Sequence, residues 1–318
     1  MGKGKNWKKD FAGAVAGKVA EDVSMSRYTS MRVGGPAEVL FFPRDVEDLS
    51  RALLFLRERE VECHTIGLGT NLLVRDGGLR GAVVRVAGGA GRIEVEGARV
   101  RVWAGAPLGG LVRDVARLGL AGLEALAGIP GTVGGAVWMN AGAFGAEIGQ
   151  RVSGVLTVSD DGKSRAYGPE DCAFGYRHSV FHRRPGEVIA EVELSLDECG
   201  AEEIDGRIRE ALAERRRKQP QRVRTAGSAF KNPPGASAAR LIDEAGLKGL
   251  RGGGGGRLPE ARELHRQHRR LRWRLRWRRH LRRRPAPHGL RAEEGGSGDG
   301  HHSRIRGSGH TLNRRKRN

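Results

Sequence analysis

The chain changes character at Gly252, and this change limits how much of it can fold. From there it reads GGGGGRLPEARELHRQHRRLRWRLRWRRHLRRR. Residues 251–318 carry 21 Lys and Arg against 5 Asp and Glu, a net charge of +16, which leaves only +4 for residues 1–250. Such a segment has too few apolar residues in a helix or strand pattern to build a core. We therefore expect the folded part of the chain to end near residue 251.

Residues 1–250 have the features of a protein from a reducing compartment. The three cysteines, Cys63, Cys172 and Cys199, are far apart and form no CxxC pair. This spacing argues against a disulfide framework and against a metal site. No window approaches the roughly 20 apolar residues of a membrane span, and the basic N-terminus lacks the apolar run of a signal peptide. We expect a soluble, cytoplasmic protein with no membrane partner.

Helix and strand patterns alternate in this part without a strict βαβ order, which favours an α+β fold. The helical patterns cover residues 10–22, 45–60 with Asp45 as the cap, 108–120, 202–220 and 236–250. The strand patterns cover residues 37–43, 61–67, 81–88, several short pieces of 93–107, and 187–196, with a hairpin turn at 160–163.

Two glycine-rich loops are candidates for a ligand site. Gly67–Asn71 (GLGTN) lies between two expected strands, where it is either an ordinary turn or a backbone cradle for a pyrophosphate. It is not a GxGxxG that opens a helix, so a Rossmann site is disfavoured. The second loop, residues 122–148, is apolar and holds seven glycines. Backbone packed closely against a flat, buried ligand explains this composition better than a surface loop does.

Five segments, in this order and spacing, resemble the UDP-N-acetylenolpyruvoylglucosamine reductase family over about residues 20–251. They are TSMRVGGPA, GLGTNLLVRDGGLRG, GLEALAGIPGTVGGAVWMNAGAFG, FGYRHSVF and GSAFKNP. The family acts in bacterial peptidoglycan synthesis, and so in cell-wall formation, cell shape and division. The resemblance implies a two-part FAD-binding region of the vanillyl-alcohol-oxidase (PCMH) type, followed by an α/β substrate-binding domain.

On this resemblance the chain divides into an N-terminal arm, two FAD-binding subdomains, a truncated substrate-binding domain and the basic tail. The expected ranges are 1–22, 23–88, 89–198, 199–251 and 252–318.

The resemblance implies a two-stage reduction. NADPH is the hydride donor, FAD carries the hydride, and the enolpyruvyl double bond of the UDP-sugar receives it. Arg177 matches the arginine at the substrate carboxylate, where a guanidinium stabilises negative charge. Ser228 matches the proton donor, which needs help because a serine hydroxyl is a weak acid. The alternatives are a surface salt bridge for Arg177 and a turn cap for Ser228.

The remaining site residues follow from the same motifs. The expected FAD contacts are Arg32, Gly67, Gly69, Thr70, Asn71, Leu72, Gly128, Ile129, Pro130, Gly131, Thr132, Gly134, Gly135, Asn140, Ala141 and Gly142. The expected substrate contacts are Tyr176, Lys218, Lys231 and Asn232, although Lys218 in RRRKQP also fits a solvated charge run. His178 and His182 have no partner pattern, and we expect them to be structural or exposed. We expect a monomer.

The family also has a glutamate near the C-terminus that acts with the serine, in a segment beginning VGGAAVS-x-KHANFI-x-N. The chain has no such segment. If the codons of residues 252–269 are read one nucleotide later, however, they can give VGGAAVSPKHANFIVNT. We therefore predict that from about Gly252 the chain is an out-of-frame translation. A substrate domain truncated in this way leaves the apolar faces of helices 202–218 and 236–250 uncovered, so we expect low stability and little or no turnover.

Two other functions stay open at this point. The tail, with Trp273 and Trp277 among arginines, has the composition of a nucleic-acid-binding or a merely solvated extension. The shifted frame makes a specific nucleic-acid partner unexpected. The chain could also be another FAD-dependent oxidoreductase of the same fold, such as an oxidase of alcohols or sugars. FGYRHS and GSAFKNP argue against that reading, as does the lack of an obvious histidine for covalent flavin attachment.

Overall fold

The computed structural model describes residues 7–88, 93–219 and 223–247. All of these lie in one of the two units into which the chain divides, residues 1–272. The first six residues, the end of the expected helix 236–250 and the predicted segment 252–318 lie outside the described residues.

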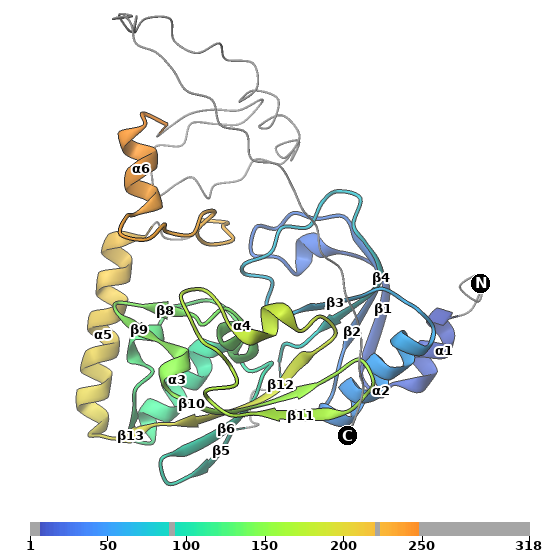
Figure 1. Ribbon diagram of the computed structural model, residues 1–318, viewed down its shortest axis with the longest axis horizontal. Helices are drawn as coiled ribbons and strands as arrows, with labels where there is room; N and C mark the ends of the chain where they lie inside the picture. Colours follow the sequence, from blue (N-terminus) through green and yellow to red (C-terminus); the bar gives the residue numbers. More distant parts are fainter. Residues whose placement is uncertain (1–6, 89–92, 220–222, 248–318) are drawn as a thin grey trace, which may run out of the picture. The chain divides into compact units, whose positions relative to one another are not determined.

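The first sheet has four strands in the order β1-β2-β4-β3 (Figure 1). β2 (Pro36–Phe42) and β3 (Cys63–Ile66) both run parallel to β4 (Leu79–Arg85). Between β2 and β3 the chain forms α2 (Val46–Glu58), whose N-cap Asp45 accepts a hydrogen bond from the Asp48 amide at 2.8 Å. The expected cap at Asp45 is thereby confirmed.

The N-terminal segment differs from the sequence prediction. Instead of a helix over residues 10–22, the structure has α1 (Trp7–Ala14) followed by β1 (Lys18–Ser24), which pairs antiparallel with β2. Gly17 explains the break, since a Cβ at this position would lie 2.1 Å from the carbonyl oxygen of Phe42. Pairing with β2 therefore overrides the local helical pattern.

The second sheet has five antiparallel strands in the order β11-β10-β12-β6-β5. Their bounds are β5 Ile93–Glu96, β6 Arg99–Trp103, β10 Val152–Val158, β11 Ser164–Tyr167 and β12 Val188–Ser195. The hairpin expected around residues 160–163 joins β10 to β11 and is confirmed. With parallel and antiparallel sheets and interspersed helices, the described part of the chain is α+β, as predicted.

One hydrophobic cluster joins both sheets and the helices between them. α2 contributes Leu49 and Leu56, and α3 (Leu108–Arg117) contributes Leu111, all at most 1% exposed. The short helix α4 (Val133–Trp138) contacts β6 and β12 and buries Val133 and Val137 in the same cluster. The loops before and after α4 are therefore held on a rigid scaffold.

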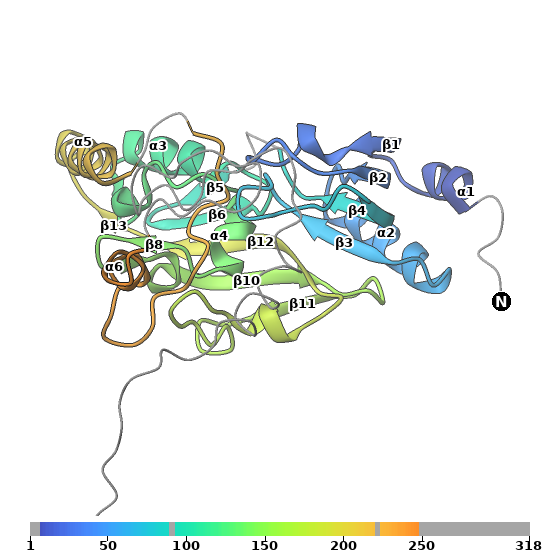
Figure 2. The ribbon, with the colours of Figure 1, turned by 90° about the horizontal axis from the view of Figure 1, so that it is seen from above.

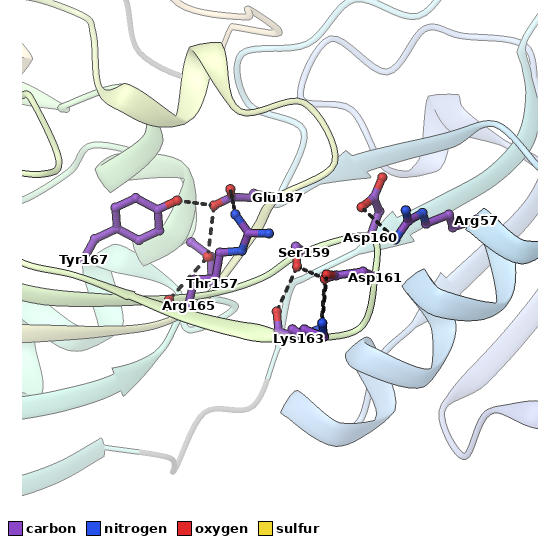
Figure 3. Close-up of polar contacts among 9 residues, drawn as sticks. All are labelled: Arg57, Thr157, Ser159, Asp160, Asp161, Lys163, Arg165, Tyr167 and Glu187. Carbon is purple, nitrogen blue, oxygen red and sulfur yellow. Dashed lines mark hydrogen bonds and ion pairs between the residues drawn. The ribbon is translucent and has the colours of Figure 1, made fainter. Parts of the chain in front are cut away.

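The β10–β11 hairpin is also tied to the first half of the chain. At its tip, the Ser50 hydroxyl of α2 donates a hydrogen bond to the carbonyl oxygen of Gly162. Arg57 of α2 forms an ion pair with Asp160 at 3.9 Å, and Figure 3 shows the two side chains facing each other. These contacts link the part of the chain that forms the first sheet to the part that forms the second.

A buried carboxylate lies beneath that hairpin. The Glu187 side chain is 7% exposed and accepts hydrogen bonds from the Tyr167 hydroxyl at 2.6 Å and from the Thr157 hydroxyl at 3.2 Å (Figure 3). Arg165 pairs with the same carboxylate at 3.6 Å. Burial and the hydrogen bond to Glu187 raise the pKa of Tyr167, so its hydroxyl stays a donor.

The C-terminal part of the described chain is built differently. β13 (Asp197–Glu198) pairs with β7 (Leu120–Ala121) and leads into α5 (Ala201–Lys218), which lies beside α3 (Figure 2). α5 buries only Ile204 and Ile208, and α6 (Ala238–Glu244) buries no residue. Both helices match predicted ones, but little of their surface is covered by the described residues.

None of the helices in the described ranges is long and apolar enough to cross a membrane.

Candidate functional site

Three loops that are far apart in the sequence meet beside the first sheet. The Thr70 hydroxyl donates a hydrogen bond to the carbonyl oxygen of Pro130 at 3.0 Å, which joins the first glycine-rich loop to the second. The Ser30 amide donates to the carbonyl oxygen of Gly69 at 3.1 Å, which adds the TSMRVGG loop. The structure thus brings together three of the segments expected to bind the cofactor.

Two glycines permit this close approach. A Cβ at Gly67 would lie 2.5 Å from the Thr132 hydroxyl, and one at Gly69 would lie 2.1 Å from the carbonyl oxygen of Tyr28. Gly69 also has a φ of +67°, which other residues adopt only at a cost. GLGTN is therefore a packed junction of loops rather than an ordinary exposed turn.

The second loop is fixed to the core on either side of α4. The Val133 amide donates to the carbonyl oxygen of Ala106 at 2.9 Å, and the Gly134 amide donates to that of Ala104 at 2.8 Å. Thr132 caps α4 by accepting a hydrogen bond from the Gly135 amide at 3.2 Å. Backbone held in this way can line a flat ligand without moving when the ligand binds.

The second loop contains Asn140, which is 1% exposed and has a φ of +43°. Its side-chain amide nitrogen donates to the Glu147 carboxylate at 2.6 Å and to the carbonyl oxygen of Gly175 at 3.0 Å. Its side-chain oxygen accepts from the Gly149 amide at 3.0 Å. Asn140 therefore connects the second glycine-rich loop to the FGYRHS segment.

Arg177 lies at the tip of a two-residue hairpin in that segment. Gly175 and His178 exchange two backbone hydrogen bonds of 3.0 Å, so Tyr176 and Arg177 form the turn. Arg177 has a φ of +53°, and its guanidinium donates to the carbonyl oxygen of Gly142 at 3.0 Å and to that of Asn140 at 3.5 Å. The expected carboxylate-binding arginine thus contacts the expected cofactor loop.

Lys231 is also brought to this place. Its ammonium group donates to the carbonyl oxygen of Arg177 at 3.2 Å. Lys231 follows Ser228 by three residues in GSAFKNP, and both are exposed. Two residues before GSAFKNP, the carbonyl oxygen of Thr225 accepts a hydrogen bond from the Ser30 hydroxyl. Residues 225–231 therefore contact both the TSMRVGG loop and the Arg177 hairpin.

The other predicted substrate contacts lie in different surroundings. Tyr176 is 50% exposed, with the Arg177 guanidinium 5.4 Å from its ring centre. Asn232 accepts a hydrogen bond from the Ala238 amide at 3.0 Å and so supports the start of α6. Lys218 pairs with Glu214 one turn earlier in α5, at 2.6 Å. This pairing is the arrangement expected of a solvated charge run.

The remaining predicted cofactor residues are distributed over the same loops. Arg32 and Asn71 are exposed on the first two loops. Leu72 and Ile129 pack against hydrophobic clusters, and the Ala141 amide donates to the carbonyl oxygen of Ala136 at 2.7 Å. Gly128 and Gly131 both have a positive φ.

Two arginines that sequence reasoning missed lie against these loops. Arg215 of α5 donates from Nε to the carbonyl oxygen of Ala127 at 3.2 Å, and its buried Nη2 has no partner among the described residues. Arg85 at the end of β4 lies over the rings of Tyr28 and Phe42, and its buried Nε is likewise unpartnered there. Burial lowers the pKa of both side chains.

These two unpartnered donors provide a test of the cofactor prediction. A buried N–H without an acceptor is costly, and a bound group that accepts the hydrogen bond is a common explanation. FAD offers phosphate oxygens and flavin carbonyl oxygens as acceptors, and the glycines leave backbone free to approach it. The residues present therefore fit FAD. Neither arginine had a sequence signal, since Arg215 lies in a run of basic residues and Arg85 ends an ordinary apolar strand.

Comparison with protein families gives two matches along the chain. A model described as FAD binding domain matches residues 37–167. A second, described as UDP-N-acetylenolpyruvoylglucosamine reductase, C-terminal domain, matches residues 219–267. The second match continues past residue 251, where we expected the resemblance to end.

Individual relatives agree with these models. UDP-N-acetylenolpyruvoylglucosamine reductase of Alkalilimnicola ehrlichii is 49% identical over 229 residues, which are 72% of this chain and 76% of that protein. The reductase of Pelobacter propionicus is 44% identical over 75% of this chain and 80% of its own. The crystal structure of the Thermus caldophilus reductase matches with a TM-score of 0.65 and 44% identity, over 75% of this chain and 84% of that one.

These comparisons confirm the predicted fold class, with an FAD-binding domain of the PCMH type in the first part of the chain. At 49% identity over most of both chains, this protein belongs to the UDP-N-acetylenolpyruvoylglucosamine reductase family.

Proposed function

We propose that the chain carries the site of an NADPH-dependent, FAD-containing reductase of UDP-N-acetylenolpyruvoylglucosamine. The observation that best supports this is the contact between Arg177 and the second glycine-rich loop. Its guanidinium lies 3.0 Å from the carbonyl oxygen of Gly142. A cationic group for a substrate carboxylate is thereby placed beside the loop expected to hold the flavin.

Arg177 binds the carboxylate of the enolpyruvyl group in this proposal. A guanidinium has five N–H donors, and only two of its nitrogens contact Asn140 and Gly142. The remaining donors can form a two-point contact with a carboxylate. Negative charge develops on that carboxylate when the double bond accepts a hydride, so Arg177 stabilises the reaction's transition state more than its ground state.

Ser228 donates the proton that completes the reduction. It lies on an exposed segment that Lys231 fastens to Arg177, since the ammonium group donates to the Arg177 carbonyl oxygen at 3.2 Å. The proton goes to the carbon next to the one that receives the hydride. A positive charge close to the Ser228 hydroxyl would favour the serine alkoxide that remains, because opposite charge stabilises the ionised form, and Lys231, three residues further along the chain, is the proposed source of that charge.

The loops at residues 28–32, 67–72 and 128–142 would hold FAD, which would supply the hydride to the substrate after reduction by NADPH. Arg215 and Arg85 would donate hydrogen bonds to it through the nitrogens that lack partners among the described residues. The glycines at 67 and 69 let these loops pack against one another and so shape the proposed cofactor site. Arg32, Asn71 and Thr70 add polar contacts at the edge.

The finer features of the proposal come from the family. NADPH is the hydride donor, the product is UDP-N-acetylmuramate for peptidoglycan synthesis, and the protein is a cytoplasmic monomer. Tyr176, Lys218 and Asn232 contact the UDP-sugar. Residues 23–88 and 89–198 form the two FAD-binding subdomains, and residues from 199 form the substrate-binding domain.

We also propose that the chain in its present reading frame turns over little or no substrate. In the described residues α6 buries no side chain and α5 buries two. The out-of-frame reading from about Gly252 removes the glutamate expected to assist Ser228. The C-terminal family model continues to residue 267, so the point at which the frame changes is a part of this proposal that needs a direct test.

The function is tested with two proteins, the present chain and a version with the reading frame restored after Leu250. Both are loaded with FAD, and NADPH oxidation is followed with and without UDP-N-acetylenolpyruvoylglucosamine. We expect substrate-dependent oxidation in the restored protein, lost on Arg177→Ala and retained on Arg183→Ala, an exposed arginine nearby. Equal rates with and without substrate in the restored protein would exclude the reductase.

Sequencing the gene across the codons for residues 250–258 tests the reading frame itself. An added or missing base would restore the family C-terminus. A confirmed sequence would leave a truncated enzyme, and the nucleic-acid alternative would then be tested by the salt dependence of binding before and after removal of residues 252–318.

A further inference from the structure

Three aromatic rings form a stack beside the Arg177 hairpin. The ring centres of Trp138 and His182 are 3.7 Å apart at an interplanar angle of 32°. Those of His182 and His178 are 5.1 Å apart at 30°. Trp138 ends α4, whereas His182 lies in a 3₁₀ turn (Val180–Arg183) after the hairpin. The stack therefore joins the second glycine-rich loop to the chain that follows Arg177.

His182, the central ring, is fixed by backbone contacts. Ser179 and His182 form a reciprocal cap, in which the neutral Nδ1 of His182 accepts from the Ser179 amide at 3.3 Å, while a protonated Nδ1 donates to the Ser179 carbonyl oxygen at 3.2 Å. The Ser179 hydroxyl, which is fully buried, donates to the carbonyl oxygen of Trp138 at 2.7 Å. His182 and the Trp138 backbone are thus held by hydrogen bonds that do not need a bound ligand.

His178, the outer ring, belongs to the hairpin itself. Its backbone closes the turn through the two hydrogen bonds with Gly175, and Arg177 is the residue before it. Arg177 has a φ of +53°, an arrangement that costs free energy in a residue with a side chain. Other interactions must therefore stabilise the turn. Stacking of the His178 ring can do so, because His178 is the residue that closes the turn.

We propose that the Trp138–His182–His178 stack is a positioning element that holds Arg177 in its site. The inference rests on the proposed function, in which Arg177 binds the substrate carboxylate. The stack does not touch the substrate in this account. It acts through the backbone of His178 and so fixes the direction from which the guanidinium approaches.

Two substitutions of His182 separate the ring from the cap. His182→Phe keeps a ring for stacking but removes the nitrogen that caps Ser179. His182→Gln removes the ring but keeps a side chain that can form the same reciprocal cap. If the stack positions Arg177, His182→Phe resembles the unaltered protein and His182→Gln does not.

The first measurement is amide hydrogen exchange in the full chain loaded with FAD. We expect the His178 amide, which bonds to the Gly175 carbonyl, to exchange about tenfold faster in His182→Gln than in His182→Phe. Amides of β12 serve as the reference and should not change. Equal exchange at His178 in the two variants would overturn the inference, whatever the protein's activity.

The second measurement is the affinity for UDP-N-acetylenolpyruvoylglucosamine compared with UDP-N-acetylglucosamine, which lacks the enolpyruvyl carboxylate. We expect His182→Gln to weaken binding of the first about tenfold relative to His182→Phe, and to leave binding of the second unchanged. Equal losses for both ligands would indicate general damage and overturn the inference. This binding measurement uses the protein with the reading frame restored after Leu250. If that protein binds neither ligand, the proposed function fails, and the exchange measurement alone decides whether the stack positions Arg177.

Discussion

Two regions of the described chain, residues 7–198 and residues 199–247, stabilise their helices in different ways. In residues 7–198, helices such as α2 and α3 are fixed by burial, with Leu49 and Leu111 at most 1% exposed. In residues 199–247, α5 buries only Ile204 and Ile208, and α6 buries nothing. The difference shows that helix formation and domain formation are separate requirements.

Local interactions stabilise the helices of the second region, in addition to the few contacts that α5 makes with the core. α5 carries the ion pairs Glu203–Arg207, Asp205–Arg209 and Glu214–Lys218, each spaced one turn apart. α6 carries Arg240–Glu244 and a Ser237 cap. Each such pair contributes only about 0.2–0.5 kcal/mol. They can hold a helix, but a substrate site on residues 223–247 needs the additional burial that a complete domain supplies.

Restoring the reading frame after Leu250 should have the largest effect on the difference between residues 7–198 and residues 199–247. We expect turnover to rise at least about a hundredfold, because a missing partner in proton transfer alone accounts for about 10²–10⁴ in rate. Steady-state NADPH oxidation measures this. A restored segment of scrambled order is the control. Equal and substrate-dependent turnover in the restored protein and the control would show that residues 199–247 already form as complete a site as the family has.

A matched pair of leucine substitutions measures the contrast in stability. Leu111→Ala should lower the free energy of unfolding by about 2–5 kcal/mol, because it leaves a cavity in the core. Leu241→Ala in α6, where the side chain is 45% exposed, should change it by less than about 0.5 kcal/mol. Urea unfolding followed by far-ultraviolet circular dichroism reports both. Similar losses would mean that α6 is part of the cooperative core.

Two asparagines give a second matched pair. Asn140→Ala should cost about 1–3 kcal/mol, because the Glu147 carboxylate, the Gly175 carbonyl and the Gly149 amide all lose a buried partner. Asn232→Ala removes one hydrogen bond, to the Ala238 amide, at an exposed position and should cost less than about 1 kcal/mol. Thermal unfolding compares them. A larger loss at Asn232 would contradict the picture of a loosely built second region.

The smallest expected effect is a loss of stability at acidic pH. Burial, followed by the positive charge of His178 and Lys231, lowers the pKa of His182 from 6.5, while the Ser179 backbone acts the other way. Above pH 6.5 His182 is neutral in both states and no stability is lost. As the pH falls below that value, the unfolded chain takes up the proton first, so the folded state loses stability. The loss is complete once the pH is below the folded-state pKa.

His182→Phe isolates this contribution, because phenylalanine keeps the ring and does not titrate. The melting temperature of the unaltered protein should fall more between pH 7 and pH 5 than that of the variant. Parallel curves would assign the acid sensitivity to other groups.

Sequence reasoning succeeded where the signal is local. The Asp45 cap, the hairpin turn at 160–163 and the helix at 202–220 each rest on residues a few positions apart, and the structure contains all three. The helix expected at 10–22 was wrong because Lys18–Ser24 pairs with β2, a partner that local periodicity does not reveal.

In the candidate site, too, some features could be predicted from the sequence and others could not. Motif resemblance predicted that the Arg177 segment and the glycine-rich loops share a site, and their contacts agree with it. It could not find Arg215, whose guanidinium reaches Ala127 from 88 residues away. Nor could it find the ring stack, because Trp138 and His182 lie more than 40 residues apart in the sequence and meet only after folding. In both cases the chemistry depends on distance in space, which residue type alone does not encode.

The hairpin that carries Arg177 also limits how this protein can vary in length. Gly175 and His178 close a loop of only two residues. One added residue there would shift the register and turn the arginine to the opposite face. The turn between β10 and β11 carries no residue of the proposed site, so its length is free to change at lower cost. Insertions and deletions among relatives should therefore accumulate around residues 160–163 and be absent from residues 175–178.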